Sequence, residues 1–313
     1  MKLAFVFPGQ GSQSVGMLST FEAAAVGAVL ARASAALGQD LASLIAGGPA
    51  EDLNLTVNTQ PAMLAAGFAV YEAWRGGGGR TPAIVAGHSL GEYTALTVAG
   101  ALTLEDAVRT VRFRATAMQE AVPVGLGAMA AILGLSDDDV RRACVEAAGG
   151  EVVEPVNFNA PSQVVIAGHR TAVERACESA KKLGAKRAML LPVSAPFHSS
   201  LMQPAAQRLR THLAGVALHS PALPVINNVD VAIETDPARI VDALARQAAA
   251  PVRWVETVLA LKDHGVTHVV ECGPGRVLAG LTRRIAPELE SLAVFDADSL
   301  QEALAATAVD GGA

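Results

Sequence analysis

The stretch Ile84-Val85-Ala86-Gly87-His88-Ser89-Leu90-Gly91-Glu92-Tyr93 decides the fold. In it an apolar strand runs into a G-x-S-x-G pentapeptide, and the helix-forming stretch Glu92–Ala99 follows. Glycine on each side of the serine permits a sharp strand-to-helix turn, which lifts the Ser89 hydroxyl clear of the sheet at the positive end of a helix. A plain turn is the alternative, because Gly-rich chains contain this pattern by chance. In this context the pentapeptide predicts a serine nucleophile in an α/β fold.

The segments around this turn alternate between strand and helix patterns. The apolar strand Leu3–Phe7 enters the glycine loop Pro8–Gln13, and helix-period stretches precede the strand Ala83–Ala86. This alternation predicts an α/β domain with a largely parallel sheet, covered by helices on both faces. The same pattern continues later in the chain, with expected helices at Glu22–Leu37, Gln60–Trp74, Leu201–Ala214, Pro237–Ala249 and Ser299–Thr307, strands at Val225–Asn228 and His268–Glu271, and a frayed tail at Val309–Ala313.

A different pattern interrupts the larger one between residues 127 and 192. Candidate strands Ala128–Leu133, Val164–Gly168 and Arg187–Leu191 alternate there with candidate helices Asp137–Ala148 and Thr171–Leu183. These elements fit a ferredoxin-like sandwich. We therefore predict a small domain at 127–192, inserted into a large domain made of residues 1–126 and 193–313.

Composition excludes several classes of function. The 313 residues carry a formal net charge of -6, which provides no basic field for nucleic acid. No apolar run reaches the length of about 18 residues that a membrane span needs, and no leader pattern is present, so we expect a soluble cytoplasmic protein that does not use a membrane. The three cysteines are widely spaced and form no C-x-x-C, so neither a disulfide framework nor a metal site is expected.

A serine nucleophile needs a base, and seven histidines compete for that role. His88 is adjacent to Ser89 on a sharp turn, where neighbouring side chains point apart, so we interpret it as packing support. His198 differs because it lies in the loop Val193–Ser199, where the chain returns from the small to the large domain and where clefts form. No acid stands out as a third member of a triad. A dyad remains, in which a backbone or amide carbonyl orients the His198 Nδ1–H.

Motifs along most of the chain resemble those of malonyl-CoA:acyl carrier protein transacylases. They occur in that family's order, from about Leu3 to Leu281. The matching segments are Phe5–Gln13, Gly87–Tyr93, Arg114 with Met118-Gln119-Glu120, Val156-Asn157-Phe158-Asn159, Pro196-Phe197-His198, Asn227-Asn228-Val229, Arg246-Gln247 and Gly273-Pro274-Gly275.

The resemblance implies a fold and a set of site residues. The fold is an α/β-hydrolase-like large domain with an inserted ferredoxin-like small domain, and the active site lies between them. The implied roles are Ser89 as nucleophile, His198 as general acid and base, Gln247 as the partner that orients His198, the amides of Gln10 and Leu90 as the oxyanion hole, and Arg114 as the clamp on the malonyl carboxylate. Met118 and Phe197 are placed beside the substrate, and the bulk of Phe197 predicts that methylmalonyl-CoA is a poor donor. Glu92, which follows the turn, is interpreted as structural.

The expected reaction is a ping-pong transfer of malonyl from malonyl-CoA to the phosphopantetheine thiol of acyl carrier protein, through a malonyl-serine, with no bound cofactor. It would supply the extension of fatty acids or polyketides. The alternatives are a serine esterase or thioesterase, the malonyltransferase subunit of malonate decarboxylase, and an inactive docking subunit that keeps the fold. An intact Ser89, His198 and Arg114 argue against the last.

Overall fold

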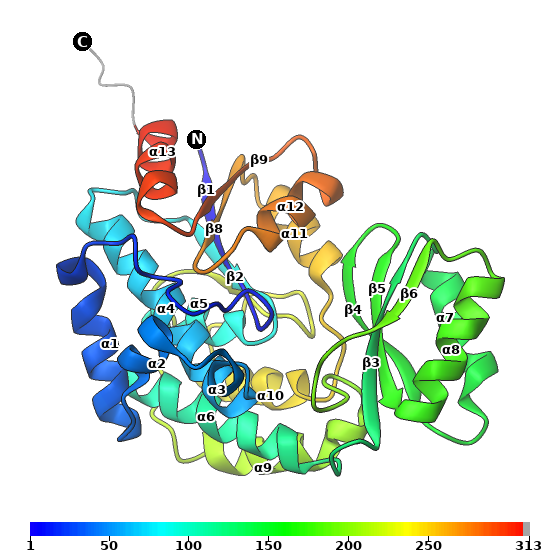
Figure 1. Cartoon of the computed structure of the whole chain (residues 1–313). Coiled ribbons are helices and arrows are strands. Elements are labelled where there is room, and N and C mark those ends of the chain that lie inside the picture. Colours follow the sequence, from blue (N-terminus) through cyan, green and yellow to red (C-terminus); the bar gives the residue numbers. More distant parts are fainter. Residues whose placement is uncertain (309–313) are drawn as a thin grey trace.

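The structure is a computed structural model, and it describes residues 1–308. These residues form two β-sheets, a five-stranded one and a four-stranded one, in two parts that lie side by side (Figure 1). The larger part contains both ends of the described chain. The smaller part, drawn in green, is built from the middle of the sequence.

The larger sheet is parallel throughout, in the order β7-β2-β1-β8-β9. Its central strand β1 (Leu3–Phe7) is buried along its whole length. Alternate residues of a strand face opposite sides of the sheet, and here Phe5 and Phe7 enter one hydrophobic core while Ala4 and Val6 enter another. The apolar run therefore reflects burial on both faces, as the sequence predicts for a parallel sheet. The other strands are β2 (Ile84–Gly87), β7 (Val225–Ile226), β8 (His268–Cys272) and β9 (Glu290–Val294).

Helices cover both faces of this sheet. The core on the Phe5 side contains buried residues of α1 (Ala23–Leu37), α4 (Thr56–Gly76), α6 (Leu104–Glu120) and α9 (Gln203–Leu213). The core on the Val6 side contains residues of α11 (Trp254–Asp263) and α12 (Val277–Ile285). The remaining helices are α2 (Leu41–Gly47), α3 (Ala50–Leu53), α5 (Gly91–Val98), α10 (Pro237–Gln247), α13 (Ala297–Thr307) and the 3-10 turn η1 (Ser200–Met202).

The smaller sheet is antiparallel, in the order β4-β5-β3-β6. Along the chain it reads β3 (Gly127–Leu133), α7 (Asp137–Ala148), β4 (Val153–Ala160), β5 (Gln163–His169), α8 (Arg170–Lys182) and β6 (Arg187–Leu190). The two helices pack on one face of this sheet around Val140, Val173 and Ile166. This βαββαβ sequence and strand order are those of a ferredoxin-like sandwich. The domain limits at 126 and 192 remain a prediction that suits this arrangement.

Strands β4 and β9 and helices α2, α3, α11 and α12 have no counterpart among the predicted elements, and one predicted helix is two elements in the structure. Strand β4 has no alternation to detect, because Pro155 and two register shifts interrupt it, and proline is tolerated there only because β4 lies at the sheet edge. Strand β9 lies at an edge of the larger sheet, and only two of its five residues are buried, so it has no continuous apolar run. The helix expected at Leu201–Ala214 is η1 followed by α9, which begins anew at Gln203 with a proline in its first turn.

Within residues 1–308, no helix combines the length and the apolarity needed to cross a bilayer. The same residues contain no group of three His, Cys, Asp or Glu side chains placed to hold a metal ion. The tail predicted at Val309–Ala313 lies outside the described residues.

Candidate active site

Ser89 lies at the turn between β2 and α5, in a left-handed backbone conformation with φ of 53°. Both flanking glycines are required by close backbone contacts. A Cβ on Gly87 would lie 1.9 Å from the carbonyl carbon of Gly91, and a Cβ on Gly91 would lie 2.0 Å from the Phe7 carbonyl oxygen. The pentapeptide therefore forms the strained turn that the sequence predicts, with the serine at its apex.

His198 lies in the loop that follows the smaller part in the sequence, and its side chain contacts Ser89. Its Nε2 lies 2.7 Å from Ser89 Oγ, and its Nδ1 lies 2.9 Å from the main-chain carbonyl oxygen of Gln247. A carbonyl oxygen only accepts hydrogen bonds, so Nδ1 carries the proton and Nε2 is left to accept the serine hydroxyl proton. The His198 orienting group is thus a backbone carbonyl rather than an acid, which is one of the two possibilities that the sequence left open.

The environment keeps His198 uncharged. Burial, reinforced by the positive charge of Arg114, lowers the pKa of His198 to about 3. At neutral pH the imidazole is therefore neutral. A neutral imidazole with a free Nε2 can take a proton from the Ser89 hydroxyl.

Arg114, on α6, is a buried cation beside the serine. Only 1% of its surface is exposed, and its Nη2 donates to Ser89 Oγ at 3.1 Å and to Gln247 Oε1 at 3.0 Å. Its Nη1 donates to Gln60 Oε1 at 2.8 Å. All of these acceptors are neutral, and among residues 1–308 the buried Nε has no acceptor. A buried guanidinium without a carboxylate partner can bind a carboxylate brought by a ligand.

Two backbone amides near Ser89 have no acceptor among the described protein atoms. They are the amides of Gln10 and Leu90. Gln10 lines the same cavity as Ser89, and its side-chain oxygen accepts a hydrogen bond from Thr56 at 2.9 Å. Leu90 directly precedes α5, so its amide lies at the positive end of that helix. Such a pair of donors can stabilise an oxyanion.

The cavity at this site has a volume of about 140 Å³. Residues of the larger part line it together with residues of the smaller part, among them Met129, Asn157 and Leu191. Met118 and Phe197, which the resemblance puts beside the substrate, line this cavity. The cavity therefore lies between the two parts and needs both to be complete.

Two polar residues at the site had no role in the sequence analysis. The Asn228 side chain accepts from the Ser89 amide at 2.7 Å and donates to the Gly87 carbonyl at 2.7 Å, which fixes the turn. Its only sequence signal is the Asn227-Asn228 motif. Gln60 holds Arg114 from within α4 and has no signal in the sequence, because nothing marks a helical glutamine as buried. His88, by contrast, fits its packing interpretation, since it contacts Asn159 at 2.8 Å and packs against Trp254.

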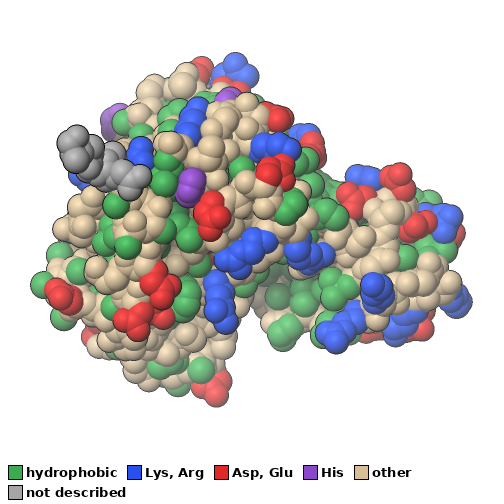
Figure 2. Space-filling model, turned by 90° about the horizontal axis from the view of Figure 1, so that it is seen from above, with side chains coloured by type: hydrophobic (Ala, Val, Ile, Leu, Met, Phe, Trp, Pro, Cys, Tyr) green, Lys and Arg blue, Asp and Glu red, His purple; other side chains and the backbone are tan. Residues whose placement is uncertain are grey.

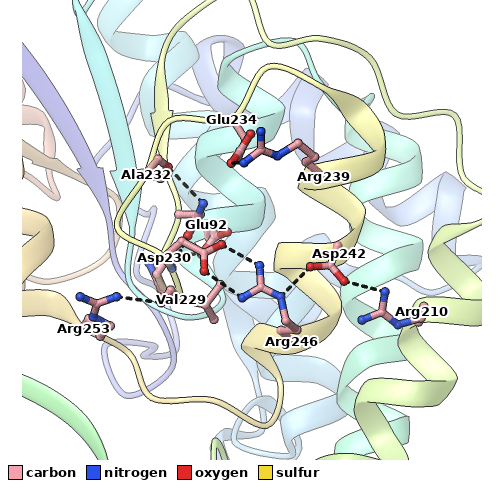
Figure 3. A network of polar contacts seen from close by, with 12 residues as sticks. Glu92, Arg210, Val229, Asp230, Ala232, Glu234, Arg239, Asp242, Arg246 and Arg253 are labelled. Carbon is pink, nitrogen blue, oxygen red and sulfur yellow. Dashed lines mark hydrogen bonds and ion pairs between the residues drawn. The ribbon is translucent and has the colours of Figure 1, made fainter.

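The last turn of α10, which carries Gln247, is anchored by an ion-pair network (Figure 3). Arg246 donates from both terminal nitrogens to Asp230, at 2.9 and 2.6 Å, and from Nε to Asp242 at 2.6 Å. Asp230 lies two residues after Asn228. The network therefore ties the segment that holds Ser89 to the segment that holds His198.

Comparison with known proteins places the chain in a family. The acyl transferase domain family matches residues 4–294. The malonyl CoA-acyl carrier protein transacylase of Escherichia coli (strain K12) is 54% identical over 305 residues, which cover 97% of this chain and 99% of that protein. A crystal structure of acyl-carrier-protein S-malonyltransferase from Burkholderia pseudomallei is 64% identical, with a TM-score of 0.96 and coverage of 97% of this chain and 100% of that one.

A further similar structure contains a carrier protein. It is described as a type II PKS acyl-carrier protein in complex with its malonyl-transacylase, is 51% identical, and has a TM-score of 0.96 with coverage of 98% and 100%. These matches extend over nearly the full length of this chain, and the motifs that carry the resemblance occupy the site described above. The chain belongs to the malonyl CoA-acyl carrier protein transacylase family of acyl transferases.

Proposed function

We propose that this chain transfers a malonyl group from malonyl-CoA to the phosphopantetheine thiol of an acyl carrier protein, through a malonyl ester of Ser89. One observation carries the proposal: the buried Arg114 guanidinium lies 3.1 Å from Ser89 Oγ. In a malonyl thioester a single methylene separates the carboxylate from the carbonyl carbon. A clamp for the carboxylate must therefore lie next to the nucleophile, as it does here.

In the first half-reaction, His198 Nε2 takes the hydroxyl proton while Ser89 Oγ attacks the thioester carbonyl. The amides of Gln10 and Leu90 stabilise the oxyanion that forms, and removal of one such donor typically costs about 3–4 kcal/mol of transition-state stabilisation. The carbon–sulfur bond then breaks, and His198 returns the proton to the coenzyme A thiolate. Malonyl-Ser89 remains.

The second half-reaction reverses these steps with a different thiol. The phosphopantetheine thiol gives its proton to His198 and attacks malonyl-Ser89, and the serine oxygen leaves and is reprotonated. Arg114 holds the carboxylate throughout, and the bidentate geometry of a guanidinium suits that task better than an ammonium does. Because one thioester is exchanged for another, the site mainly has to keep water from the ester.

The relatives support the partner as well as the reaction. The Escherichia coli relative is a malonyl CoA-acyl carrier protein transacylase, and a similar structure contains an acyl carrier protein bound to its transacylase. We retain the cytoplasm as the proposed location. Whether this chain serves fatty acid synthesis, polyketide synthesis or malonate decarboxylation depends on the carrier protein that accepts the malonyl group.

The test is to incubate the protein with malonyl-CoA, measure its intact mass, and then add candidate carrier proteins. We expect a malonyl adduct that Ser89→Ala abolishes and that His198→Ala slows by orders of magnitude, and we expect a carrier to remove the adduct. A malonyl adduct on folded Ser89→Ala protein contradicts the proposal. Steady release of free malonate without any carrier would identify a thioesterase instead.

A further inference from the structure

Glu92, in the first turn of α5, is a carboxylate buried behind the site. Only 2% of its surface is exposed, and it does not line the cavity that contains Ser89. A single oxygen, Oε2, accepts hydrogen bonds from Gln247 Nε2 and from the Asn228 amide, each at 2.9 Å. Glu92 thus joins the end of α10 to the segment after β7.

The hydrogen bonds of Gln247 allow only one orientation of its amide. Its Nε2 donates to the Ser89 carbonyl at 2.9 Å as well as to Glu92, and its Oε1 accepts from Arg114. Turned by half a rotation, the amide would place its oxygen against two acceptors and its NH₂ against a guanidinium. Amide orientation is set by such networks. The acceptor on Glu92, together with the Ser89 carbonyl, therefore favours the orientation in which an oxygen, and not an NH₂, faces Arg114.

A second path leads from Glu92 to the nucleophile itself. The Asn228 amide that Glu92 holds belongs to the residue whose side chain fixes the Ser89 turn. A disturbance along this path changes the nucleophile, and so changes transfer from every acyl donor alike. A disturbance along the Gln247 path also reaches Arg114, so it lowers transfer from donors that carry a carboxylate more than transfer from donors that do not. The two effects are separable by comparing donors.

We propose that Glu92 is a positioning residue for donor selectivity: by fixing the Gln247 amide it holds Arg114 in place to bind the malonyl carboxylate. This inference rests on the proposed function, because it takes Arg114 as the clamp. Burial raises the pKa of Glu92 to about 7, so the carboxyl is not fully ionised at neutral pH. The role needs an acceptor oxygen, which either protonation state provides.

The experiment uses Glu92→Gln, Glu92→Met and Glu92→Asp, and measures the rates of malonyl and acetyl adduct formation by intact mass, with folding checked by thermal melt. Glutamine keeps an acceptor oxygen at the same distance, so the malonyl-to-acetyl ratio should stay within about twofold of wild type. Methionine has similar length and no acceptor oxygen, so the ratio should fall about tenfold, the effect of losing one hydrogen bond of average strength. Aspartate keeps the carboxylate, but its shorter side chain moves the acceptor oxygen away from Gln247 Nε2, so the malonyl-to-acetyl ratio should also fall.

Each other outcome overturns the proposal. An unchanged ratio in folded Glu92→Met, with both rates lowered equally, means that Glu92 only stabilises the fold. A malonyl-to-acetyl ratio that falls in Glu92→Gln means that donor selectivity depends on the charge of Glu92 and not on its acceptor oxygen. If Glu92→Met does not fold, Glu92→Asp decides, and a wild-type ratio there refutes the proposal. Failure of the proposed function is distinct, because wild-type protein would then form no malonyl adduct at Ser89.

Discussion

Three arginines of α6 show how differently one residue type behaves within a single helix. Arg109 is exposed and pairs with Asp106 at 2.8 Å, and Arg112 donates to Gln39. Arg114 alone is buried, beside Ser89. A buried cation costs several kcal/mol unless it is compensated. Its position next to the nucleophile is therefore the residue-scale feature on which the proposed donor selectivity rests.

Arg114→Ala should strongly lower the rate of malonyl transfer. The rate of acetyl transfer should rise relative to the rate of malonyl transfer. The malonyl carboxylate loses its cation, whereas an acetyl group never used one. Arg114→Lys should fall between wild type and Arg114→Ala, because an ammonium keeps the charge but not the two-pronged geometry. The measurement is the ratio of malonyl to acetyl adduct formation rates. Arg112→Ala, two residues away, is the matched control and should leave that ratio unchanged, and a folded Arg114→Ala protein with a wild-type ratio would contradict the assignment.

The lowered pKa of His198 predicts an unusual pH profile for adduct formation. With a pKa of about 3 instead of 6.5, the imidazole stays neutral at pH 5, where an ordinary histidine would have lost about thirtyfold in its neutral form. The acetyl adduct rate of wild type should therefore hold from pH 7 down to about 5. Arg114→Ala removes a nearby positive charge, so its acid limb should move to higher pH. An acid limb centred near 6.5 in wild type would contradict the prediction.

The same pKa shift affects stability, so folding must be followed in parallel. The pKa of His198 is lower in the folded protein than in the unfolded chain, so the unfolded chain binds a proton at His198 first as the pH falls. The free energy of unfolding therefore decreases between pH 6.5 and about 3. Circular dichroism at each pH separates a loss of fold from a loss of base.

At the scale of elements, the contact between β1, β2 and α5 sets the geometry of the nucleophile. Gly87→Ala should destabilise the protein by at least about 3 kcal/mol, because its Cβ would meet the backbone of Gly91 and backbone cannot move aside cheaply. Urea denaturation measures the change. Gly27→Ala is the matched control. Gly27 lies in α1, and a Cβ at this position would have no atom within 4 Å, so alanine there should stabilise by about 0.5–1 kcal/mol. Equal effects of the two substitutions would refute the close contact.

The position of each strand in its sheet explains why the sequence predicts β1 but not β4. Strand β1 is buried on both faces, so every position is apolar and the pattern is continuous. Strand β4 lies at an edge, contains Pro155 and pairs irregularly. Its pairing with β5 is decided by the neighbouring strand and not by its own side chains.

At the scale of the whole molecule, charge raises a question about the carrier, because acyl carrier proteins are acidic and this chain has a net charge of -6. Attraction then requires local basic patches. Figure 2 shows an indentation between the two parts, with Lys and Arg side chains on both of its sides. The candidates are two exposed clusters: Lys181, Lys182, Lys186 and Arg187 on the smaller part, and Arg283 with Arg284 on α12.

If the cluster on the smaller part binds the carrier, the charge reversal Lys186→Glu/Arg187→Glu should raise KM for the carrier about tenfold. It should leave the rate of the malonyl-CoA half-reaction unchanged. For wild type, KM for the carrier should rise with salt, since exposed charges are screened. Arg239→Glu, an exposed charge on α10, serves as the control. Carrier kinetics that do not depend on salt, with neither cluster affecting KM, would exclude docking through charge.

The sequence by itself determined the features that local geometry requires. The turn around Ser89 follows from two glycines that permit close backbone contacts, and the parallel sheet follows from apolar strands that alternate with helix-period stretches. Ser89 is predicted from the pentapeptide, His198 from the loop Val193–Ser199, and Arg114 from the family resemblance. The structure brings these three residues within hydrogen-bond distance of one another or of a shared partner. Their catalytic roles remain proposals that this geometry supports.

Only the tertiary structure decided how those residues are held. The group of Gln247 that orients His198 is its main-chain carbonyl and not its side chain, and every residue has such a carbonyl, so the family motif alone could not show which group makes the contact. The burial of Arg114 depends on which face of α6 meets the core, and the acceptors Gln60 and Glu92 are brought to the site from separate elements. A linear sequence carries local preferences, whereas the solvation and the partners of a charge depend on residues that are distant along the chain.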